Sequence, residues 1–283
     1  MKSLGILGPK GTHSEEAALW LKKFSREDFK LEICADIFDV LNAVKERELD
    51  AGLVPVENSL EGSINITLDT LARSDTLTIT RELVWKVKNF LMTKPLVDAK
   101  NVQKIYSHAQ PLAQCRKFLR KNFPDVEIIS TTSTARAAEL VAQSDEICAA
   151  ICTERAGKLN GLAIAAKNIQ DNPNNSTRFF EISYRPRDAA PIETFDGDKV
   201  LIICQIDGSR AGSLCGVLEE FSKRGVNMTR IESRPARTIL GAYIVFFDLE
   251  TDAGNDALNE AIRAVYDKSI WLKNLGVFPV IYA

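Results

Sequence analysis

Histidine is scarce in this sequence, with only His13 and His108 among 283 residues. The six cysteines are scattered, and no two of them form a C-x-x-C pair; they are Cys34, Cys115, Cys148, Cys152, Cys204 and Cys215. Zinc sites need closely spaced Cys and His ligands, so we predict no bound metal. The same scatter argues against a disulfide framework and favours a cytosolic protein with reduced, mostly buried thiols.

The sequence also lacks an excess of one charge and any long apolar run. Its 36 Lys and Arg residues nearly balance 38 Asp and Glu residues, for a net charge of −2. A nucleic-acid partner would need a basic face, so we predict none. No run approaches the roughly 18 apolar residues of a membrane span, and the start at 1–9 is too short for a signal peptide. We therefore expect a cytoplasmic protein without a membrane partner.

Nucleotide-binding and hydrolase signatures are missing as well. The spacing Gly5-x-x-Gly8-x-x-Gly11 is neither the dinucleotide fingerprint nor a P-loop, because no Gly-Lys-Ser/Thr follows. With two histidines, no Ser-His-Asp arrangement is readable. We predict no organic cofactor.

What is present is a repeated alternation of strand and helix patterns. Short apolar runs predict strands at 3–7, 31–34, 51–54, 104–106, 126–129 and 147–151, with amphipathic helices between them. Thr12-x-x-Glu15 fits a capping box, and Asp36 fits a helix N-cap. This order predicts two α/β lobes, lobe one at about 1–77 and 168–186 and lobe two at about 78–167. The two crossings would form a hinge beside a cleft.

The last part of the chain has a different order. After a linker at 184–191, strands are predicted at 199–206, 226–233, 242–249 and 275–282, with helices at 212–224 and 255–266. The order βαββαβ predicts a ferredoxin-like domain over 198–283.

Four predicted strands in the lobes end in polar junctions that lead into helices. The junctions are Gly8–Thr12, Glu57–Ser59, Ser107–Gln110 and Ser130–Thr134. Free N–H groups at helix starts favour negative charge, and open α/β sheets bind ligands beyond their strand ends. The pattern predicts a site for a small anion. The alternative is that each Ser or Thr is only an N-cap.

A fifth polar stretch runs from Asp171 to Phe180, and we expect the chemistry here. It begins as an Asn- and Pro-rich turn and continues into a strand pattern. Thr177 offers a hydroxyl, and Arg178 offers a fork of donors suited to a carboxylate. The alternative is an ordinary polar turn before an edge strand.

Taken together, the motifs resemble the prephenate dehydratase family, in the family's order and over nearly the whole chain. The matching segments are Gly8–Thr12 with Ser14, Val56–Gly62, Ser107–Gln110 with Gln114-Cys115, Ser133-Thr134-Ala135 and Asn175–Phe179. The departures are His13 where an aromatic residue is usual, Ala109 where Pro is common and Ser213 where Ala is common.

The resemblance implies a catalytic module of the periplasmic-binding-protein type over 1–186 and conversion of prephenate to phenylpyruvate, water and CO2. It implies a catalytic role for Thr177, as a hydrogen-bond partner of the departing oxygen. By motif match, substrate binding falls to Thr12, Asn58, Ser59, Ser107, Gln114, Ser133 and Thr134. Arg178 either pairs with a substrate carboxylate or forms a structural salt bridge.

The C-terminal unit resembles an ACT regulatory domain through Gly212-Ser213-Leu214 and Glu232-Ser233-Arg234-Pro235. The resemblance implies feedback inhibition by L-phenylalanine and a homodimer or homotetramer formed through these domains. The expected effector residues are Gly212, Ser213, Leu214, Asn227, Glu232 and Ser233. Three alternatives stay open: an arogenate dehydratase, a non-catalytic two-lobed binding protein and an amino-acid sensor.

Overall fold

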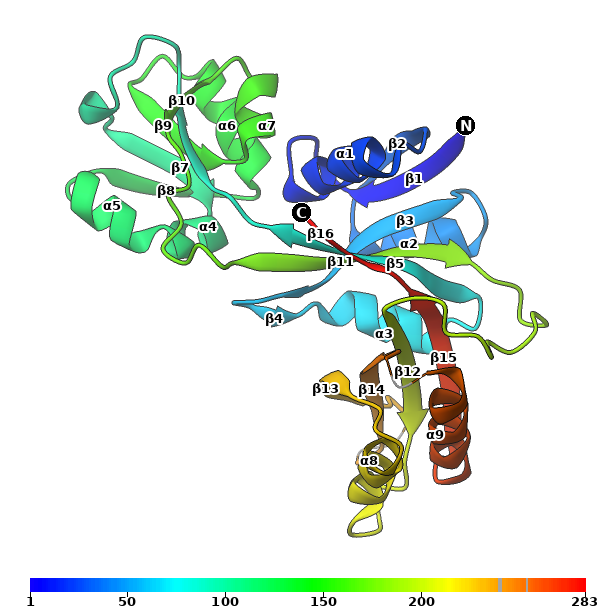
Figure 1. Cartoon of the computed structure of the whole chain (residues 1–283). Helices are drawn as coiled ribbons and strands as arrows, with labels where there is room; N and C mark the ends of the chain where they lie inside the picture. Colours follow the sequence, from blue (N-terminus) through cyan, green and yellow to red (C-terminus); the bar gives the residue numbers. More distant parts are fainter. Residues whose placement is uncertain (239–240, 253) are drawn as a thin grey trace.

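The computed structural model describes residues 1–238, 241–252 and 254–283, which form two α/β lobes and a C-terminal domain, each around its own sheet (Figure 1). In lobe one the strand order is β16-β5-β11-β3-β1-β2, with β4 beside β3. The strands are β1 (Lys2–Leu7), β2 (Phe29–Cys34), β3 (Ala51–Asn58), β4 (Gly62–Ser63), β5 (Leu77–Lys86), β11 (Ser176–Tyr184) and β16 (Val280–Tyr282). Helix α1 (His13–Ser25) packs on one face of this sheet, and α2 (Ile37–Lys45) and α3 (Asn65–Arg73) pack on the other.

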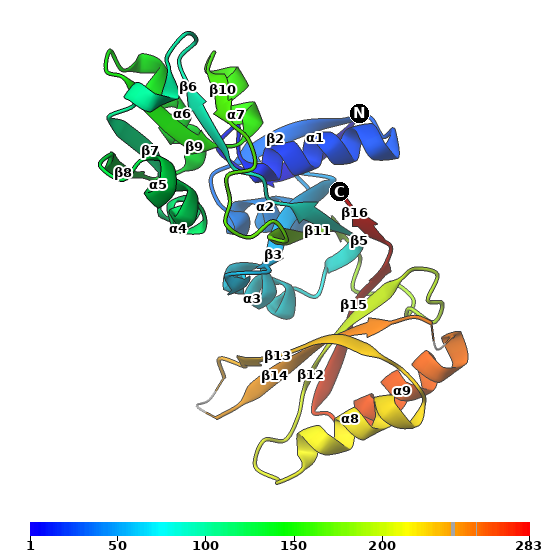
Figure 2. The same cartoon turned by 60° about the vertical axis from the view of Figure 1, so that its left-hand side comes forward.

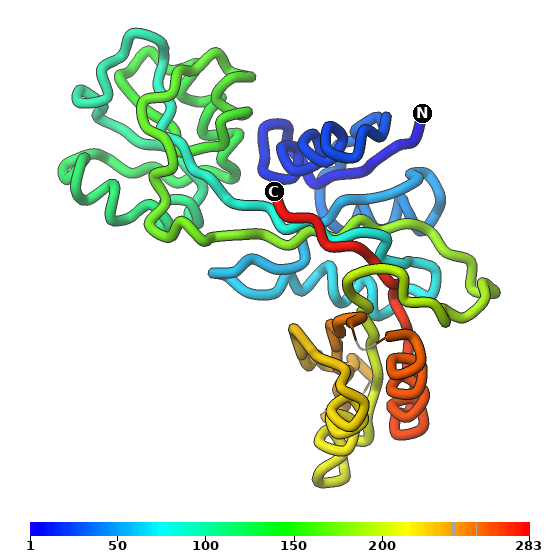
Figure 3. The backbone as a smooth tube through the Cα atoms, viewed as in Figure 1, coloured from blue at the N-terminus to red at the C-terminus, as the bar shows by residue number. Residues whose placement is uncertain are grey.

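Lobe two is a five-stranded sheet in the order β10-β6-β9-β7-β8. Its strands are β6 (Phe90–Thr93), β7 (Lys104–His108), β8 (Glu127–Thr131), β9 (Cys148–Cys152) and β10 (Ala163–Ala166). Its helices are α4 (Ala109–Gln114), α5 (Arg116–Asn122), α6 (Thr134–Gln143) and α7 (Glu154–Leu159), with a 3₁₀ turn at Ala99–Asn101. The chain enters lobe two after β5 and returns into β11, so two crossings join the lobes as expected (Figure 3).

The C-terminal domain has the strand order β13-β14-β12-β15, the ferredoxin-like arrangement that the sequence predicted. Its elements are β12 (Lys199–Gln205), α8 (Ser213–Lys223), β13 (Met228–Pro235), β14 (Tyr243–Glu250), α9 (Asn255–Asp267) and β15 (Trp271–Phe278). Both helices cover one face of the sheet (Figure 2). The other face is not open: Phe246 and Phe278 pack with Phe180 and Ile182 of lobe one in a shared core.

The end of the chain differs from the expectation of a single strand at 275–282. That prediction is wrong, because β15 ends at Phe278 and the chain crosses into lobe one, where β16 pairs in parallel with β5. Proline has no N–H to donate to a ladder, and Pro279 lies at the break. Its carbonyl instead accepts a hydrogen bond from Glu82 N at 2.9 Å. The last residues therefore belong to the sheet that carries Thr177.

Two boundaries in the lobes also differ from the sequence prediction. Strand β3 continues to Asn58, beyond the predicted end of the strand at residue 54, because β11 pairs with it along that length. The helix predicted between the strands at 104–106 and 126–129 is split into α4 and α5 at Cys115. Asp171 makes the split, since its N–H donates to Gln114 O at 2.7 Å and its carboxylate accepts from Lys117 N at 3.0 Å.

Candidate active site

Thr177 lies in the second position of β11, between β3 and β5. Its Cα partners are Asn58 on β3 and Trp85 on β5. Side chains of paired residues share a face of the sheet, so all three lie on the α1 side, with Phe179 two positions on. Arg178 lies on the opposite face. The pleat of one strand thus sends two consecutive polar side chains into different surroundings.

Asn58 is the centre of the hydrogen bonds around Thr177. Its buried side-chain Nδ2 donates to Thr177 Oγ1 at 3.0 Å and to Asn175 Oδ1 at 2.9 Å. Its Oδ1 accepts from Leu60 N at 3.0 Å and Glu61 N at 3.2 Å, which fixes the loop after β3. Because Thr177 Oγ1 accepts from an amide, its own proton is free for another acceptor.

Ser59 joins the same cluster from the exposed side. Its N–H donates to Ser176 O at 2.9 Å, and its Oγ accepts from Ser176 N at 3.0 Å. The structure therefore brings together Asn58, Ser59 and Thr177, three of the residues singled out in the sequence. It adds Asn175, which the motif contained but to which we had assigned no role.

His13 follows the first junction and was noted in the sequence only as a departure from the family. Trp85 Nε1 donates to His13 Nδ1 at 3.4 Å, which places the imidazole on the same side of the sheet as Thr177. Loss of solvent lowers the pKa of His13 from 6.5 to about 4, against a smaller upward effect of the neighbouring Asn89. The ring is therefore neutral at neutral pH.

Several buried polar atoms where the two lobes join have no hydrogen-bond partner within the described chain. They include His13 Nε2, Asn89 Nδ2 and Oδ1, Gln114 Nε2 and Asn175 Nδ2. They come from lobe one, both crossings and lobe two. Asn89, which is fully buried, lies beside both His13 and Cys115, the residue after Gln114. Buried polar atoms normally have partners, so this group is suited to a polar ligand.

The sequence analysis missed Asn89. It follows an extended segment with no motif around it, and only the fold shows that it is buried with both side-chain polar atoms unused. Its backbone is fixed on both sides, since Asn89 N donates to Gln170 Oε1 at 3.0 Å and Asn89 O accepts from Ile169 N at 3.0 Å. The two crossings are thus tied together at this residue.

The lobes also touch at the start of α1. Gly11 has a φ of +87°, and a Cβ at this position would lie 2.9 Å from the Cα of Ala156, so both conformation and space require glycine. Thr153 Oγ1 donates to Gly11 O at 2.6 Å, and Arg155 pairs with Glu15 at 2.7 Å.

Thr12 is the N-cap of α1, but the capping box predicted with Glu15 is wrong. The Thr12 side chain makes no capping bond and donates instead to Leu7 O at 3.3 Å. Glu15 accepts from Gly11 N at 2.6 Å, one position before the cap.

The predicted substrate residues of lobe two make hydrogen bonds within that lobe. Ser107 is fully buried and donates to Ile151 O at 2.6 Å. Ser133 is the N-cap of α6 and accepts from Arg136 N at 3.0 Å, with Thr134 next to it. Gln114 ends α4 with its Nε2 unpartnered. Substrate binding by these residues stays a prediction.

Of the two roles predicted for Arg178, its contacts are those of a structural salt bridge. Its guanidinium pairs with Glu82 at 2.7 Å, with Glu57 at 2.8 Å and with Asp248 of the C-terminal domain at 2.5 Å. Burial lowers the pKa of Arg178, but these carboxylates outweigh that effect and raise it above its ordinary value. All its strong contacts lie on the face away from Thr177. A substrate contact by Arg178 stays a prediction.

The predicted effector residues fall on two sides of the C-terminal sheet. Gly212 is the N-cap of α8 with a φ of +83°, followed by Ser213, which donates to Arg210 O at 2.9 Å, and by the part-exposed Leu214. Asn227 donates to Glu250 at 2.7 Å. Ser233 is exposed, whereas Glu232 faces lobe one and bonds Ser63 and Arg230.

A cavity of about 390 Å³ lies between the two lobes, beside Trp85 and Arg155. Trp20, Trp85 and Arg155 are among its lining residues, and none of the predicted substrate residues is.

Over residues 1–238, 241–252 and 254–283, no three Cys, His, Asp or Glu side chains gather as a metal site would need. In the same ranges every helix is too short or too polar to cross a membrane.

Comparisons with known proteins agree with this architecture. The sequence profile "Prephenate dehydratase" matches residues 4–187, and that of the ACT domain matches residues 201–265. A bifunctional chorismate mutase/prephenate dehydratase of Aquifex aeolicus is 39% identical over 98% of this chain and 73% of its own length. The prephenate dehydratase of Arthrobacter aurescens, solved with L-Phe, is 32% identical with a TM-score of 0.86, covering 98% of this chain and 90% of that one. GqqA, described as a novel type of quorum quenching acylase, is 25% identical with a TM-score of 0.85, covering 99% and 98%.

Proposed function

Because the chain belongs to the prephenate dehydratase family, we propose that it converts prephenate to phenylpyruvate, water and CO2. It is then a carbon–oxygen lyase of phenylalanine biosynthesis. The observation that carries the chemistry is the bond from Asn58 Nδ2 to Thr177 Oγ1 at 3.0 Å. It leaves the Thr177 proton as a donor in the α1 face of the sheet, held on a strand with neighbours on both sides.

The reaction needs orientation and help for one leaving group. The bond from the ring to its carboxylate breaks and its electron pair enters the ring, which expels the ring oxygen with the pair of the C–O bond. The Thr177 hydroxyl donates a hydrogen bond to that oxygen as negative charge develops. A Thr hydroxyl is a poor acid, so we infer polarisation rather than full proton transfer before the bond breaks. The hydroxide that leaves then takes a proton from solvent and becomes the product water. Orientation alone can supply about 7–11 kcal/mol.

Neutral donors are suited to hold the substrate dianion. Asn89, Gln114 and Asn175 each have a buried amide N–H without a partner among the described residues, and they come from lobe two and both crossings. Amides and hydroxyls bind a dianion through partial positive charge without a fixed opposing ion, and the N-terminus of α1, which begins at His13, adds charge of the same sign. We assign Thr12, Ser59, Ser107, Ser133 and Thr134 to the same site by motif match.

The deciding experiment is a side-by-side assay of the purified chain on prephenate and arogenate. GqqA has the same fold under a different name, so the fold alone does not decide the reaction. We expect phenylpyruvate from prephenate with a higher kcat/KM than for arogenate. A higher value for arogenate would identify an arogenate dehydratase, and no turnover of either substrate would overturn the proposed activity.

We further propose that L-phenylalanine binds the ACT domain and inhibits the enzyme. The N-terminus of the 11-residue helix α8 begins at Gly212, where a side chain would meet nothing within 4 Å, so its N–H groups are accessible to a carboxylate. Calorimetric titration of phenylalanine, with and without a prephenate analogue, tests this, because coupling must be reciprocal. Unchanged affinity in the presence of the analogue would contradict inhibition through affinity.

The proposal includes a homodimer or homotetramer formed through ACT domains in the cytoplasm. Lobe one covers one face of the ACT sheet, so pairing between subunits is left to its edges, β13 and β15, or to the helices. Ile231 on β13 is 47% exposed, and β13 pairs on one side only within the described chain. All six cysteines are free thiols, as suits a reducing compartment. Light scattering of the purified chain would test the assembly.

A further inference from the structure

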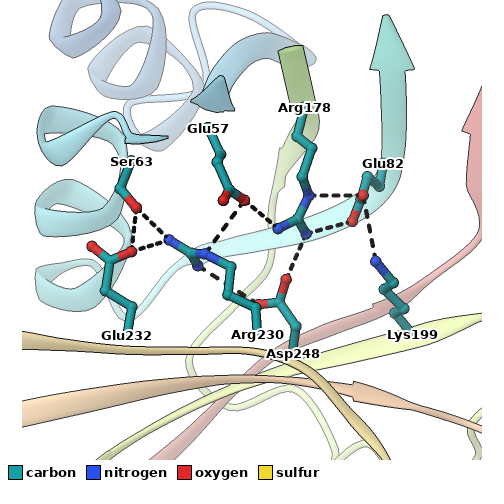
Figure 4. Close-up of polar contacts among 8 residues, drawn as sticks. All are labelled: Glu57, Ser63, Glu82, Arg178, Lys199, Arg230, Glu232 and Asp248. Atoms are coloured by element: carbon teal, nitrogen blue, oxygen red, sulfur yellow. Dashed lines mark hydrogen bonds and ion pairs between the residues drawn. The ribbon is translucent and has the colours of Figure 1, made fainter. Parts of the chain in front are cut away.

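The ion pairs of Arg178 continue into a network that crosses from lobe one to the ACT sheet (Figure 4). Lobe one contributes Arg178, Glu57, Glu82 and Ser63, and the ACT domain contributes Asp248, Arg230, Glu232 and Lys199. Asp248 is fully buried and Glu82 is 1% exposed, whereas the outer members retain some solvent contact. Removing one partner from a buried pair costs far more stability than a surface pair contributes.

Two guanidinium groups make the crossing. Arg178 reaches Asp248 at 2.5 Å from the lobe side. Arg230 reaches back from β13 to Ser63 Oγ at 2.9 Å and to Glu57 at 3.4 Å. The ACT domain therefore contacts the two strands that carry Thr177 and Asn58, β11 through Arg178 and β3 through Glu57.

The contacted residues lie next to the site residues along the chain. Glu57 precedes Asn58, Ser63 follows the loop that Asn58 fixes, and Arg178 follows Thr177. The polar cluster of Asn58 and Thr177 faces α1, whereas the network faces the ACT sheet. The sheet of lobe one separates them, because each strand alternates its side chains between its two faces.

We propose that Asp248 is a positioning residue that carries the state of the ACT domain to Thr177 through Arg178. The inference rests on the proposed function and adds the route of its regulation. A shift of β14 relative to lobe one moves Asp248, and Arg178 follows because the pair is buried and short. Thr177 is bonded to Arg178 in the same strand, so its hydroxyl moves relative to Asn58.

The effector motif enters the same network. Glu232 bonds Ser63 and Arg230 and lies one residue before the exposed Ser233. Both bonds use Oε2 of Glu232, so an effector amino group that binds this carboxylate competes with Arg230 for its charge, and Arg230 also holds Glu57. A ligand shifts an equilibrium only through such a difference in contacts between two states.

Asp248→Asn is the central variant, with Asp69→Asn as its control. Asp69 is also a buried carboxylate at the interface between lobe one and the ACT domain, pairing with Arg234 at 3.0 Å, but it does not touch β11. In Asp248→Asn, Arg178 keeps Glu57 and Glu82, so Thr177 keeps its position and we expect kcat within about threefold of wild type. We expect inhibition by phenylalanine to weaken at least about fivefold, the lower end of measured couplings. Asp69→Asn should be inhibited like wild type.

Three outcomes overturn the inference: Asp248→Asn inhibited like wild type, Asp69→Asn weakened equally, or wild type that turns over prephenate without inhibition. A wild type with no turnover would instead reject the proposed function. A readout without turnover is the fluorescence of Trp85, the cross-strand neighbour of Thr177, in a Trp20→Phe/Trp271→Phe background. Phenylalanine should change it in that background and not when Asp248→Asn is added. If Asp248→Asn does not fold, Arg230→Gln, which releases Glu57, must weaken inhibition in its place.

Discussion

Thr177 and Arg178 are adjacent in β11, yet their side chains serve opposite faces of one sheet. Thr177 accepts a hydrogen bond from Asn58 at 3.0 Å, and Arg178 pairs with Asp248 of the ACT domain at 2.5 Å. A single strand therefore joins the predicted chemistry to the regulatory domain. The consequence is that substitutions at these two neighbours should have different effects.

Thr177→Ala should lower kcat by orders of magnitude while leaving the fold and much of the substrate affinity intact. The variant removes the one hydroxyl that Asn58 orients, and Thr177 is only partly buried, so little packing is lost. Steady-state kinetics on prephenate and thermal unfolding provide the measurements, with Thr177→Ser as the control that keeps the hydroxyl. Retention of more than about a tenth of wild-type kcat, under ~1.4 kcal/mol of barrier, would remove Thr177 from the central role.

Thr177 and Arg178 also show which features could be predicted from the sequence and which could not. The order of strands and helices predicted two lobes and a ferredoxin-like domain, because hydrophobic periodicity is a local property. The residues Asn58, Ser59 and Thr177 could also be predicted from local patterns, since each lies at a recognisable junction between a strand and a loop. The partners of Arg178 were not, because pairing with Asp248 joins positions 70 residues apart.

Asn89 and β16 were missed on the same physical ground. Nothing local marks Asn89 as buried without partners, and nothing local tells the last strand to leave its own domain. Both depend on how separate sheets pack. The capping box at Thr12 was also wrong, because the Thr12 hydroxyl bonds Leu7 O and the Glu15 carboxylate is shared between Gly11 N and Arg155 of the other lobe.

Asn89→Ala should raise KM for prephenate about fivefold or more with little loss of stability. Among the described residues neither side-chain polar atom has a hydrogen-bond partner, so the substitution removes buried polar atoms that are costly when unpaired. Kinetics and urea unfolding separate the two effects. The control is Asn122→Ala, where the amide bonds Phe118 O on the surface and neither quantity should change much. A destabilised Asn89→Ala enzyme with normal KM would assign Asn89 a purely structural role.

His13 should make the stability depend on pH between about 7 and 4. Its pKa falls from 6.5 to about 4 in the folded chain, so in this window the unfolded chain binds the proton more readily. The stability that His13 contributes is complete above its unfolded pKa and is lost as pH falls toward the folded value, at most about 3 kcal/mol.

The measurement is the free energy of unfolding in urea at pH 7, 5.5 and 4.5 for wild type and His13→Gln. Glutamine can still accept from Trp85 but does not titrate, so the difference between the two proteins should shrink or reverse as pH falls. Parallel pH profiles for both proteins would show that the imidazole is no less basic in the folded chain than in the unfolded chain.

Ending the chain after Pro279 should destabilise lobe one although the removed residues follow the ACT domain in sequence. Strand β16 pairs with β5, Ala283 N donates to Val84 O at 3.0 Å, and Ile281 packs in the core under α1. Loss of these contacts is expected to cost about 2 kcal/mol, or about 4–8 °C in Tm. It also leaves β5 as an unpaired edge, which favours association between chains.

Thermal unfolding and light scattering on the shortened chain test this expectation. Tyr282→Ser is the matched control, because the Tyr282 side chain is 73% exposed and the backbone pairing stays intact. We expect the control to unfold within about 1 °C of wild type, as surface substitutions usually do. A shortened chain with wild-type Tm and no new association would mean that β5 does not depend on β16, and that the sheet carrying Thr177 is complete without the C-terminal strand.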